Sequence, residues 1–122
     1  MKAMIAWWDL TDSRQTAGTL RDFIRRESEH WTGIPGLILK VWLSDPATDR
    51  WGALMLWESE EAARAAVLPT SPAELIGHPI DFRAWFDVEA TAEGVHSLRA
   101  LSGLGPALEN LVPANFEEYY ET

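Results

Sequence analysis

The sequence contains no cysteine, and this absence removes several kinds of chemistry. Disulfide bonds, thiolate metal sites and cysteine nucleophiles are excluded, and a chain without cysteine fits a reducing compartment. We therefore expect a cytoplasmic protein. Apolar runs long enough to span a bilayer are also missing, so we expect no membrane partner.

Basic residues are scarce. Ten lysines and arginines stand against 19 aspartates and glutamates, which gives a formal net charge of −9. Such a chain repels phosphate backbones, so we expect no nucleic-acid partner.

Motifs for metals and cofactors are missing as well. The histidines at positions 30, 78 and 96 form no HxH or HxxxH pair, and no acidic cluster has the spacing of metal ligands. No glycine-rich phosphate loop follows a strand, and no serine stands in a GxSxG motif. We expect neither a metal nor a cofactor.

Tryptophan, in contrast, is abundant, with seven in 122 residues. The indole ring is large, rigid and amphipathic, so a chain of this kind has a bulky core or an aromatic-lined pocket. The length fits a single domain, and the apolar fraction of 47% is ordinary for a globular protein.

The hydrophobic pattern predicts the element order βαββαβ. Strands are expected over 2–9, 37–43, 51–57 and 80–88, and helices over about 13–31 and 59–68. The first helix has Asp12 and Ser13 as capping candidates and ends at TGIPG. This order predicts an α+β, ferredoxin-like fold with one four-stranded antiparallel sheet and two helices on one face.

Both faces of the expected sheet carry large apolar side chains. The strand over 37–43 places Leu37, Leu39 and Val41 on one face and Lys40 and Trp42 on the other. One layer of helices covers one face only. A second subunit is the economical cover for the other face, so the sequence predicts a homodimer.

Three segments resemble a known family. They are GLILKVWLSD (36–45), WGALMLWESEEAARAA (51–66) and FRAWFDVEA (82–90). With the element order over 2–90, they are similar to the YdhR-like monooxygenases of the dimeric α/β-barrel superfamily. The resemblance implies two ferredoxin-like subunits packed sheet to sheet, each with its own pocket between its sheet and its helices.

The same superfamily hosts cofactor-free oxygenases, polyketide cyclases, dehydratases and haem-degrading enzymes, and the fold alone does not choose between them. The haem-degrading relatives need a helical histidine after the third strand. Between Glu58 and Gly77 the sequence has none, so haem is not expected.

The chain divides at about residue 90. We expect residues 1–90 to form the ferredoxin-like dimeric α/β-barrel domain and residues 91–122 to form a helical extension packed on it. Val95, Leu98 and Leu101 recur at helical spacing, and LVPANFEEYY is too apolar for a disordered tail. Such an arm could close the pocket or cross to the partner subunit. Residues 1–90 contain no tyrosine, so Tyr119 or Tyr120 of the arm would be the tyrosine available to a pocket.

Six residues are predicted to bind substrate. Trp57 matches the position at which the resemblance implies a pocket-facing tryptophan, and strand alternation puts Met55 on the same side. The full set is Trp57, Trp8, Met55, Phe23, Trp31 and Arg83. For Arg83, cation–π or salt-bridge packing is the alternative interpretation.

The segment LRDFIRRESEHW (20–31) contains a carboxylate in an apolar stripe. Leu20, Phe23 and Trp31 share one helix face, and Glu27 falls within about 20° of Leu20 on it. An ionised carboxylate there must find a partner or take up a proton, and His30 at i+3 can reach it. Glu27 and His30 are therefore predicted to be catalytic acid–base groups. Alternatively, Glu27 lies at the solvent-exposed edge of the helix face, or it forms a structural ion pair.

Two further residues are candidates. His78 stands in GHP before the fourth strand, at a sheet end where pockets of this fold open, and it is the third predicted catalytic residue. A simply exposed loop histidine is the alternative. Lys40 is either a pocket residue or the ion-pair partner of Asp81, Asp87 or Glu58.

The predicted function is an enzyme acting on a hydrophobic, aromatic or polyketide-like biosynthetic intermediate. As a cofactor-independent monooxygenase it would deprotonate an electron-rich substrate, which then reduces O₂. As an acid–base cyclase, isomerase or dehydratase it would move a proton with Glu27 and His30 while tryptophans hold the substrate. A non-catalytic, small-molecule-binding accessory protein is the remaining alternative.

Overall fold

The structure is a computed structural model that describes residues 1–95 and 98–109. Its elements are β1 (Lys2–Asp9), α1 (Ala17–Thr32), β2 (Leu37–Asp45), β3 (Arg50–Trp57), α2 (Glu60–Ala65), α3 (Ala73–Ile76), β4 (Phe82–Asp87), the 3₁₀ helix η1 (Leu98–Leu101) and α4 (Pro106–Glu109). The predicted order βαββαβ is confirmed, and the extra elements are short.

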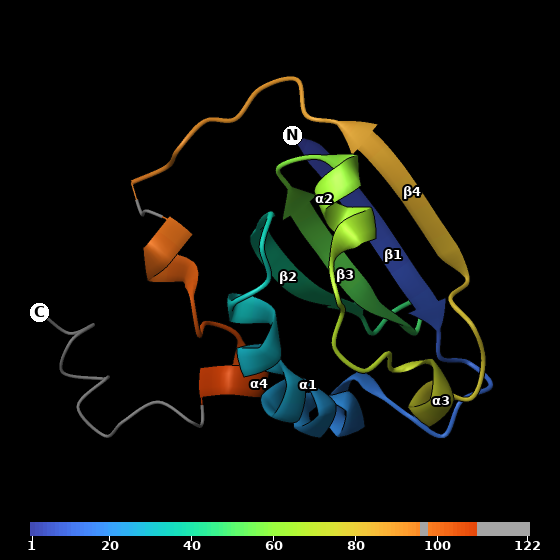
Figure 1. The fold of residues 1–122 in the computed structure, drawn as a ribbon. Coiled ribbons are helices and arrows are strands. Elements are labelled where there is room, and N and C mark those ends of the chain that lie inside the picture. The colour runs from blue at the N-terminus through green and yellow to red at the C-terminus, as the bar shows by residue number, and fades with distance from the viewer. Residues whose placement is uncertain (96–97, 110–122) are drawn as a thin grey trace, which may run out of the picture.

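The four strands form one antiparallel sheet in the order β2–β3–β1–β4 (Figure 1). The chain is thus an α+β protein, and its sheet is compatible with the ferredoxin-like fold that the sequence predicts. β2 and β4 are the edge strands, so β2 has a strand neighbour, β3, on one side only.

Strand alternation divides the sheet into two faces. On one face, β1 and β3 pair Met4 with Met55, Ala6 with Ala53 and Trp8 with Trp51. These six residues are buried, and α1 packs over them through its own buried residues, which are Leu20, Phe23, Ile24 and Trp31. The apolar stripe predicted for the first helix is therefore confirmed.

The start of α1 differs from the prediction. The helix begins at Ala17, not near Ser13, because Thr16 and Thr19 cap it reciprocally. The backbone N–H of each residue donates to the hydroxyl of the other, at 3.1 Å from Thr19 N to Thr16 Oγ1 and 2.8 Å from Thr16 N to Thr19 Oγ1. Ser13 lies in the preceding loop instead, where its hydroxyl donates to the carbonyl of Ile76 at 2.7 Å.

The start of β2 also differs. A shift in register between Leu37 and Leu39 places Leu37 opposite Trp57, whereas Leu39 lies opposite Leu56. Directly paired residues point to the same face, so Leu37 joins the helix-covered core beside Trp57. The simple alternation predicted from the sequence placed Leu37 with Leu39.

The other face of the sheet is apolar and partly exposed. Its strands contribute Leu43, Phe82 and Phe86 as exposed large side chains, and Trp7 stacks on Phe82 with ring centroids 4.0 Å apart. The helices that cover the core, α1 and α2, lie on the opposite side.

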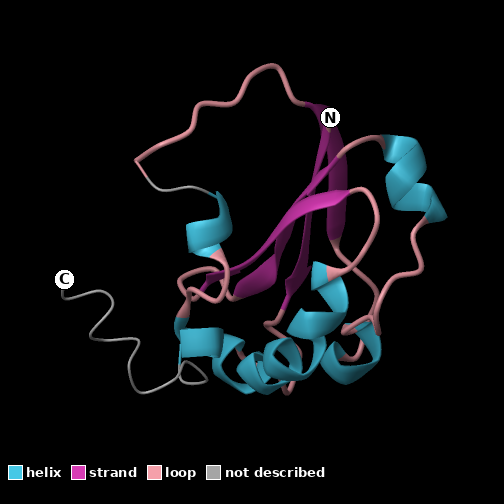
Figure 2. Ribbon diagram, turned by 60° about the vertical axis from the view of Figure 1, so that its left-hand side comes forward, coloured by secondary structure: helices cyan, strands magenta, loops and turns pink. Residues whose placement is uncertain are grey.

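After β4 the chain arches away from the sheet and returns toward α1 (Figures 1 and 2). There α4 lies beside α1. Its residues Ala107 and Leu108 pack against the core cluster that contains Leu20, Phe23 and Ile24 of α1. Arg25 Nε of α1 donates to the carbonyl of Ala107 at 2.7 Å. Val95 does not pack as expected, since it is almost fully exposed. Within the predicted helical extension over 91–122, the described residues form η1 and α4, and His96, Tyr119 and Tyr120 lie outside the described residues.

Candidate functional site

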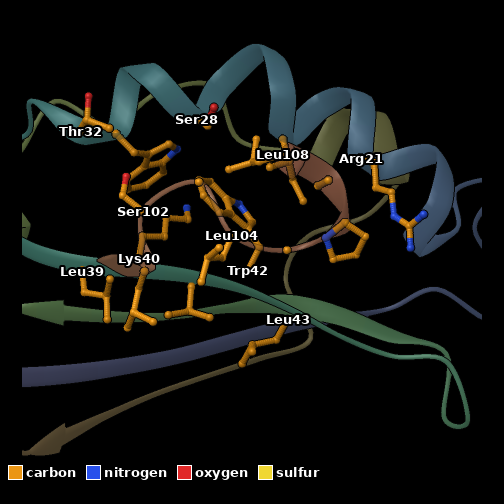
Figure 3. A pocket seen from close by; sticks show the side chains of 18 of the residues that line it. Arg21, Ser28, Thr32, Leu39, Lys40, Trp42, Leu43, Ser102, Leu104 and Leu108 are labelled. Carbon is orange, nitrogen blue, oxygen red and sulfur yellow. The ribbon is translucent and has the colours of Figure 1, made fainter. Parts of the chain in front are cut away.

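A pocket of about 680 Å³ lies between α1, the edge strand β2 and the segment that contains η1 and α4 (Figure 3). Its apolar walls come from Trp31, Trp42, Trp51 and Leu104, among others. The size and the lining are those of a small-molecule site, where a few polar groups fix the orientation of an apolar ligand.

Lys40 is the amine of this pocket. It pairs with Met55 across β2 and β3, so its side chain points to the helix-covered face of the sheet. Its Nζ lies 3.2 Å from the centroid of the Trp31 ring and 5.0 Å from that of Trp42. Two indole faces therefore hold the amine inside an aromatic wall.

No carboxylate compensates this amine within residues 1–95 and 98–109. The ion pairs formed there use other groups, and Asp87, one of the expected partners of Lys40, pairs with Lys2. Of the two alternatives for Lys40, the ion pair with Asp81, Asp87 or Glu58 is therefore not found among the described residues. The reason is topological, because Asp87 ends β4, at the opposite edge of the sheet from β2.

The chemical consequence is that the pKa of Lys40 lies near neutral pH. Desolvation by burial lowers the pKa of Lys40 from the ordinary 10.5 to about 7. The Trp31 ring acts in the opposite direction, because its face attracts an ammonium by about 0.5–2 kcal/mol. Even with that offset, a useful fraction of Lys40 is a neutral amine at neutral pH, able to take a proton or attack a carbonyl.

The sequence had placed Glu27 and His30 together, and the structure does so too. Glu27 Oε2 lies 3.1 Å from His30 Nδ1 on successive turns of α1, with side-chain exposures of 14% and 64%. Neither residue lines the described pocket. The pair sits at the surface of α1, with the carboxylate mostly covered and the imidazole mostly in water.

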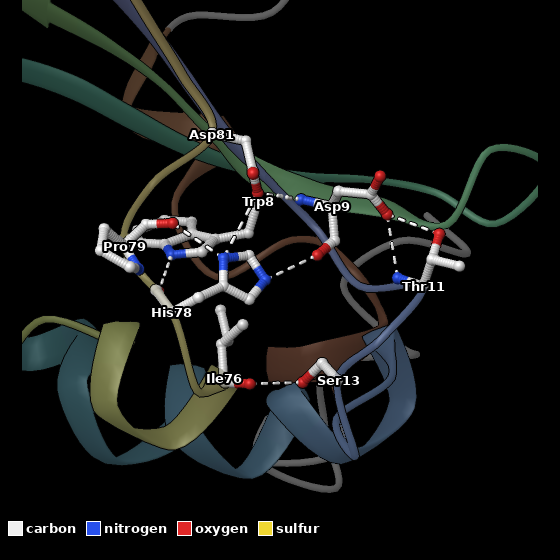
Figure 4. A network of polar contacts seen from close by, with 8 residues as sticks. All are labelled: Trp8, Asp9, Thr11, Ser13, Ile76, His78, Pro79 and Asp81. Atoms are coloured by element: carbon white, nitrogen blue, oxygen red, sulfur yellow. Dashed lines mark hydrogen bonds and ion pairs between the residues drawn. The ribbon is translucent and has the colours of Figure 1, made fainter.

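His78 ties the end of β1 to the loop before β4 (Figure 4). Its Nδ1 lies 2.8 Å from the carbonyl oxygen of Pro79, and its Nε2 lies 2.9 Å from that of Asp9. Its own carbonyl accepts from Trp8 Nε1 at 3.0 Å. Two carbonyl acceptors suit an imidazolium, which donates from both nitrogens, and Asp81 Oδ2 lies 3.5 Å from Nδ1.

The pKa of His78 is therefore raised, first by the bond to the Pro79 carbonyl and further by the bond to Asp9 and the charge of Asp81. A raised pKa contributes stability that is complete below the unfolded value near 6.5 and is lost as the pH rises through the folded value. We expect His78→Gln to lower the melting temperature at about pH 5.5 and to differ less from the wild type at about pH 8.5. A pH-independent effect of His78→Gln would contradict the prediction.

The predicted substrate-binding residues separate in the structure. Trp31 lines the pocket. Trp8 and Phe23 lie in one part of the core, and Met55 and Trp57 lie in the other.

Arg83 stands apart from the other five. It lies on the edge strand β4 opposite Ala6, and it is exposed.

The sequence by itself allows Lys40 to be either a pocket residue or an ion-pair partner. Alternation along β2 already put Lys40 and Trp42 on one face. The contact between Trp31 of α1 and the Lys40 amine could not be predicted from the sequence, because it depends on how the helix packs on the sheet.

Compared with models of protein families and with curated protein sequences, the chain has no match. In residues 1–95 and 98–109, no three histidine or acidic side chains are grouped so that they could hold a metal ion. Within the same ranges, no helix has the length and apolar character needed to cross a membrane.

Proposed function

We propose that this protein is an enzyme that binds a hydrophobic aromatic or polyketide-like molecule in the pocket between α1 and β2 and removes a proton from it with Lys40. One observation carries the proposal: the amine lies between two indole rings, without a carboxylate partner among the described residues. The rings of Trp31 and Trp42 offer flat apolar surfaces to an aromatic ligand. A desolvated lysine beside it is a base of suitable strength.

The resemblance to YdhR-like monooxygenases favours an oxygenase that needs no cofactor. In that reaction Lys40 takes a proton from an acidic methylene, and the carbanion reduces O₂ and combines with it to form a hydroperoxide. Loss of water then leaves a carbonyl, so that R₂CH₂ and O₂ give R₂C=O and H₂O. Lys40 returns its proton to the departing oxygen.

The same base also suits a cyclase or isomerase that uses no O₂. A lysine whose pKa is near 7 both removes a proton and returns one at neutral pH. Four residues with hydroxyl groups line the pocket: Ser28, Thr32, Ser44 and Ser102. The Thr32 hydroxyl already donates to the carbonyl of Glu29 at 2.8 Å, so the three serines are the donors that can hold a developing oxyanion.

Anthrone is a suitable first probe, because it is flat and carries an acidic methylene. We expect the wild type to consume O₂ with anthrone at neutral pH and Lys40→Met to lose at least about a hundredfold in rate. Lys2→Met, which removes the other lysine, is the matched control and should keep the activity. Calorimetry separates binding from turnover: binding that persists in Lys40→Met assigns the loss to chemistry.

The outcomes distinguish the three classes of function. Isomerised or cyclised product without O₂ consumption would indicate the acid–base enzyme. Binding by the wild type without any turnover would favour an accessory binding protein. An active Lys40→Met variant would remove Lys40 as the base.

We further propose that two chains pair through the exposed apolar sheet face. The support is the apolar character of that face, on which Leu43 at one sheet edge and Phe82 and Phe86 at the other are each 38% or more exposed. Contiguous apolar surface of this kind is rare on a monomer, and sheet-to-sheet packing would bury it.

We expect light scattering to give twice the chain mass of 13.7 kDa. Ile5→Lys places a charge at the middle of the same face, on the central strand β1, and should yield a monomer, because a charge inside such an interface is costly. Glu29→Lys, on the exposed surface of α1, is the control and should stay dimeric. A monomeric wild type at micromolar concentration would contradict this prediction.

A further inference from the structure

The position of Lys40 would allow its amine to act as a nucleophile toward a molecule bound in the pocket. Its Nζ ends in the pocket against the Trp31 ring, and the pocket is open to ligands of small-molecule size. Resting on the proposed binding of an aromatic molecule in this pocket, we propose that Lys40 forms an imine with aromatic aldehydes or ketones that bind there. The site then carries covalent chemistry in addition to proton removal.

The step balances without any further reactant. The lone pair of Nζ attacks the carbonyl carbon, and the carbonyl oxygen takes up a proton, which gives a carbinolamine. In forming the carbinolamine the nitrogen has lost one of its two protons. It then loses the second proton while the hydroxyl group takes up a proton and leaves as water, so that amine and carbonyl give an imine and one water. No electron is transferred, and no oxidant is required.

Three features of the pocket favour this step. Burial keeps part of the Lys40 population unprotonated at neutral pH, which a nucleophilic amine requires. Trp31 and Trp42 can hold the aromatic ring of the ligand beside the amine. The hydroxyls of Ser28 and Ser102 line the same space and can stabilise the carbinolamine oxygen.

The chain provides its own control for this chemistry. It contains two lysines, Lys2 and Lys40. Lys2 forms an ion pair with Asp87, and the hydrogen bond to this carboxylate raises the pKa of Lys2. At neutral pH the Lys2 amine is therefore held as an ammonium, which cannot attack a carbonyl.

The test uses 2-naphthaldehyde and sodium cyanoborohydride with the intact protein at about pH 7.5. Reduction of the imine fixes the ligand on the amine, with a mass gain of the aldehyde less one oxygen. Peptide mapping then compares the two lysines within one sample. We expect Lys40 to be labelled at least about tenfold faster than Lys2, because a larger fraction of it is unprotonated.

A second measurement tests the pocket. Naphthalene, which binds the rings but has no carbonyl, should slow the labelling of Lys40 and leave that of Lys2 unchanged. Lys40→Arg should lose the fast label, and Lys2→Arg should keep it.

Equal labelling of the two lysines, or slower labelling of Lys40, would overturn the inference. That result would leave the proposed function intact if Lys40→Met still abolishes turnover of anthrone, because a base need not be a nucleophile. Fast labelling of Lys40 without any turnover would support the imine and count against the proposed proton abstraction. The comparison within the wild type needs no variant, so a poorly folded mutant cannot obscure it.

Discussion

At about pH 6, Lys40→Met is expected to raise the free energy of unfolding by about 2–4 kcal/mol. Burial lowers the pKa of Lys40 from 10.5 to about 7, so the folded state resists its charge. A shift of this size corresponds to about 4–5 kcal/mol, and the attraction of the Trp31 ring offsets part of it. Methionine has a similar length and no charge to desolvate, so it removes the penalty and keeps the packing.

The sign of the pH dependence follows from this shift. Below about pH 7 both the folded and the unfolded chain carry the charged lysine, and the whole penalty applies. Between about 7 and 10.5 the unfolded chain binds more protons than the folded one, so the wild type gains stability as the pH rises. The advantage of Lys40→Met should therefore shrink across that window and disappear above it.

Urea unfolding at about pH 6, 8 and 10, at one protein concentration, measures this difference. Lys2→Met is the matched control, because removing the partner of Asp87 should lower stability at pH 6. For Lys2 the raised pKa gives stability that is lost only as the pH rises through the folded value. A Lys40→Met variant less stable than the wild type at pH 6 would show that the charged lysine is well satisfied.

A second large effect is expected at Gly52, which is buried where β3 approaches β1. A Cβ atom at this position would lie 2.0 Å from the carbonyl oxygen of Ala6 and 2.6 Å from Trp7 Cα. Both are backbone atoms of a central strand, so neither can rotate away as a side chain could. We expect Gly52→Ala to cost about 3–5 kcal/mol or to prevent folding.

Gly33→Ala is the matched control. Gly33 follows α1, has a negative φ, and has open space where its Cβ would lie. Its replacement should change the free energy of unfolding by less than about 0.5 kcal/mol. Equal stability of the two variants in urea would contradict this prediction, because it would show that β3 can shift away from β1.

Much of the fold could be predicted because local periodicity reports which side of an element is buried. Leu20, Phe23 and Trp31 recur at helical spacing, and α1 buries that stripe on the sheet. Trp51, Ala53 and other alternate residues of β3 share one face, as a period of two requires. These patterns need no knowledge of distant segments.

Element ends and contacts between elements were harder to predict, because they depend on groups far apart in the sequence. Ser13 was a plausible helix cap, but its hydroxyl donates to Ile76, 63 residues later, and Thr16 caps α1. Leu37 lies on the opposite face from the predicted one, because the register of β2 against β3 shifts between Leu37 and Leu39. Neither the hydrogen bond of Ser13 nor the register shift of β2 can be recognised from the neighbouring residues in the sequence.

The candidate site shows the same division. The sequence alone determined that Lys40 and Trp42 share a face of β2, and that Glu27 and His30 are one helical turn apart. Tertiary structure alone decided that Trp31 covers the Lys40 amine, whereas Glu27 and His30 are not part of the pocket lining. Periodicity sets the direction of a side chain within its own element, but the charge state of a buried amine depends on the water and the partners that other elements leave to it.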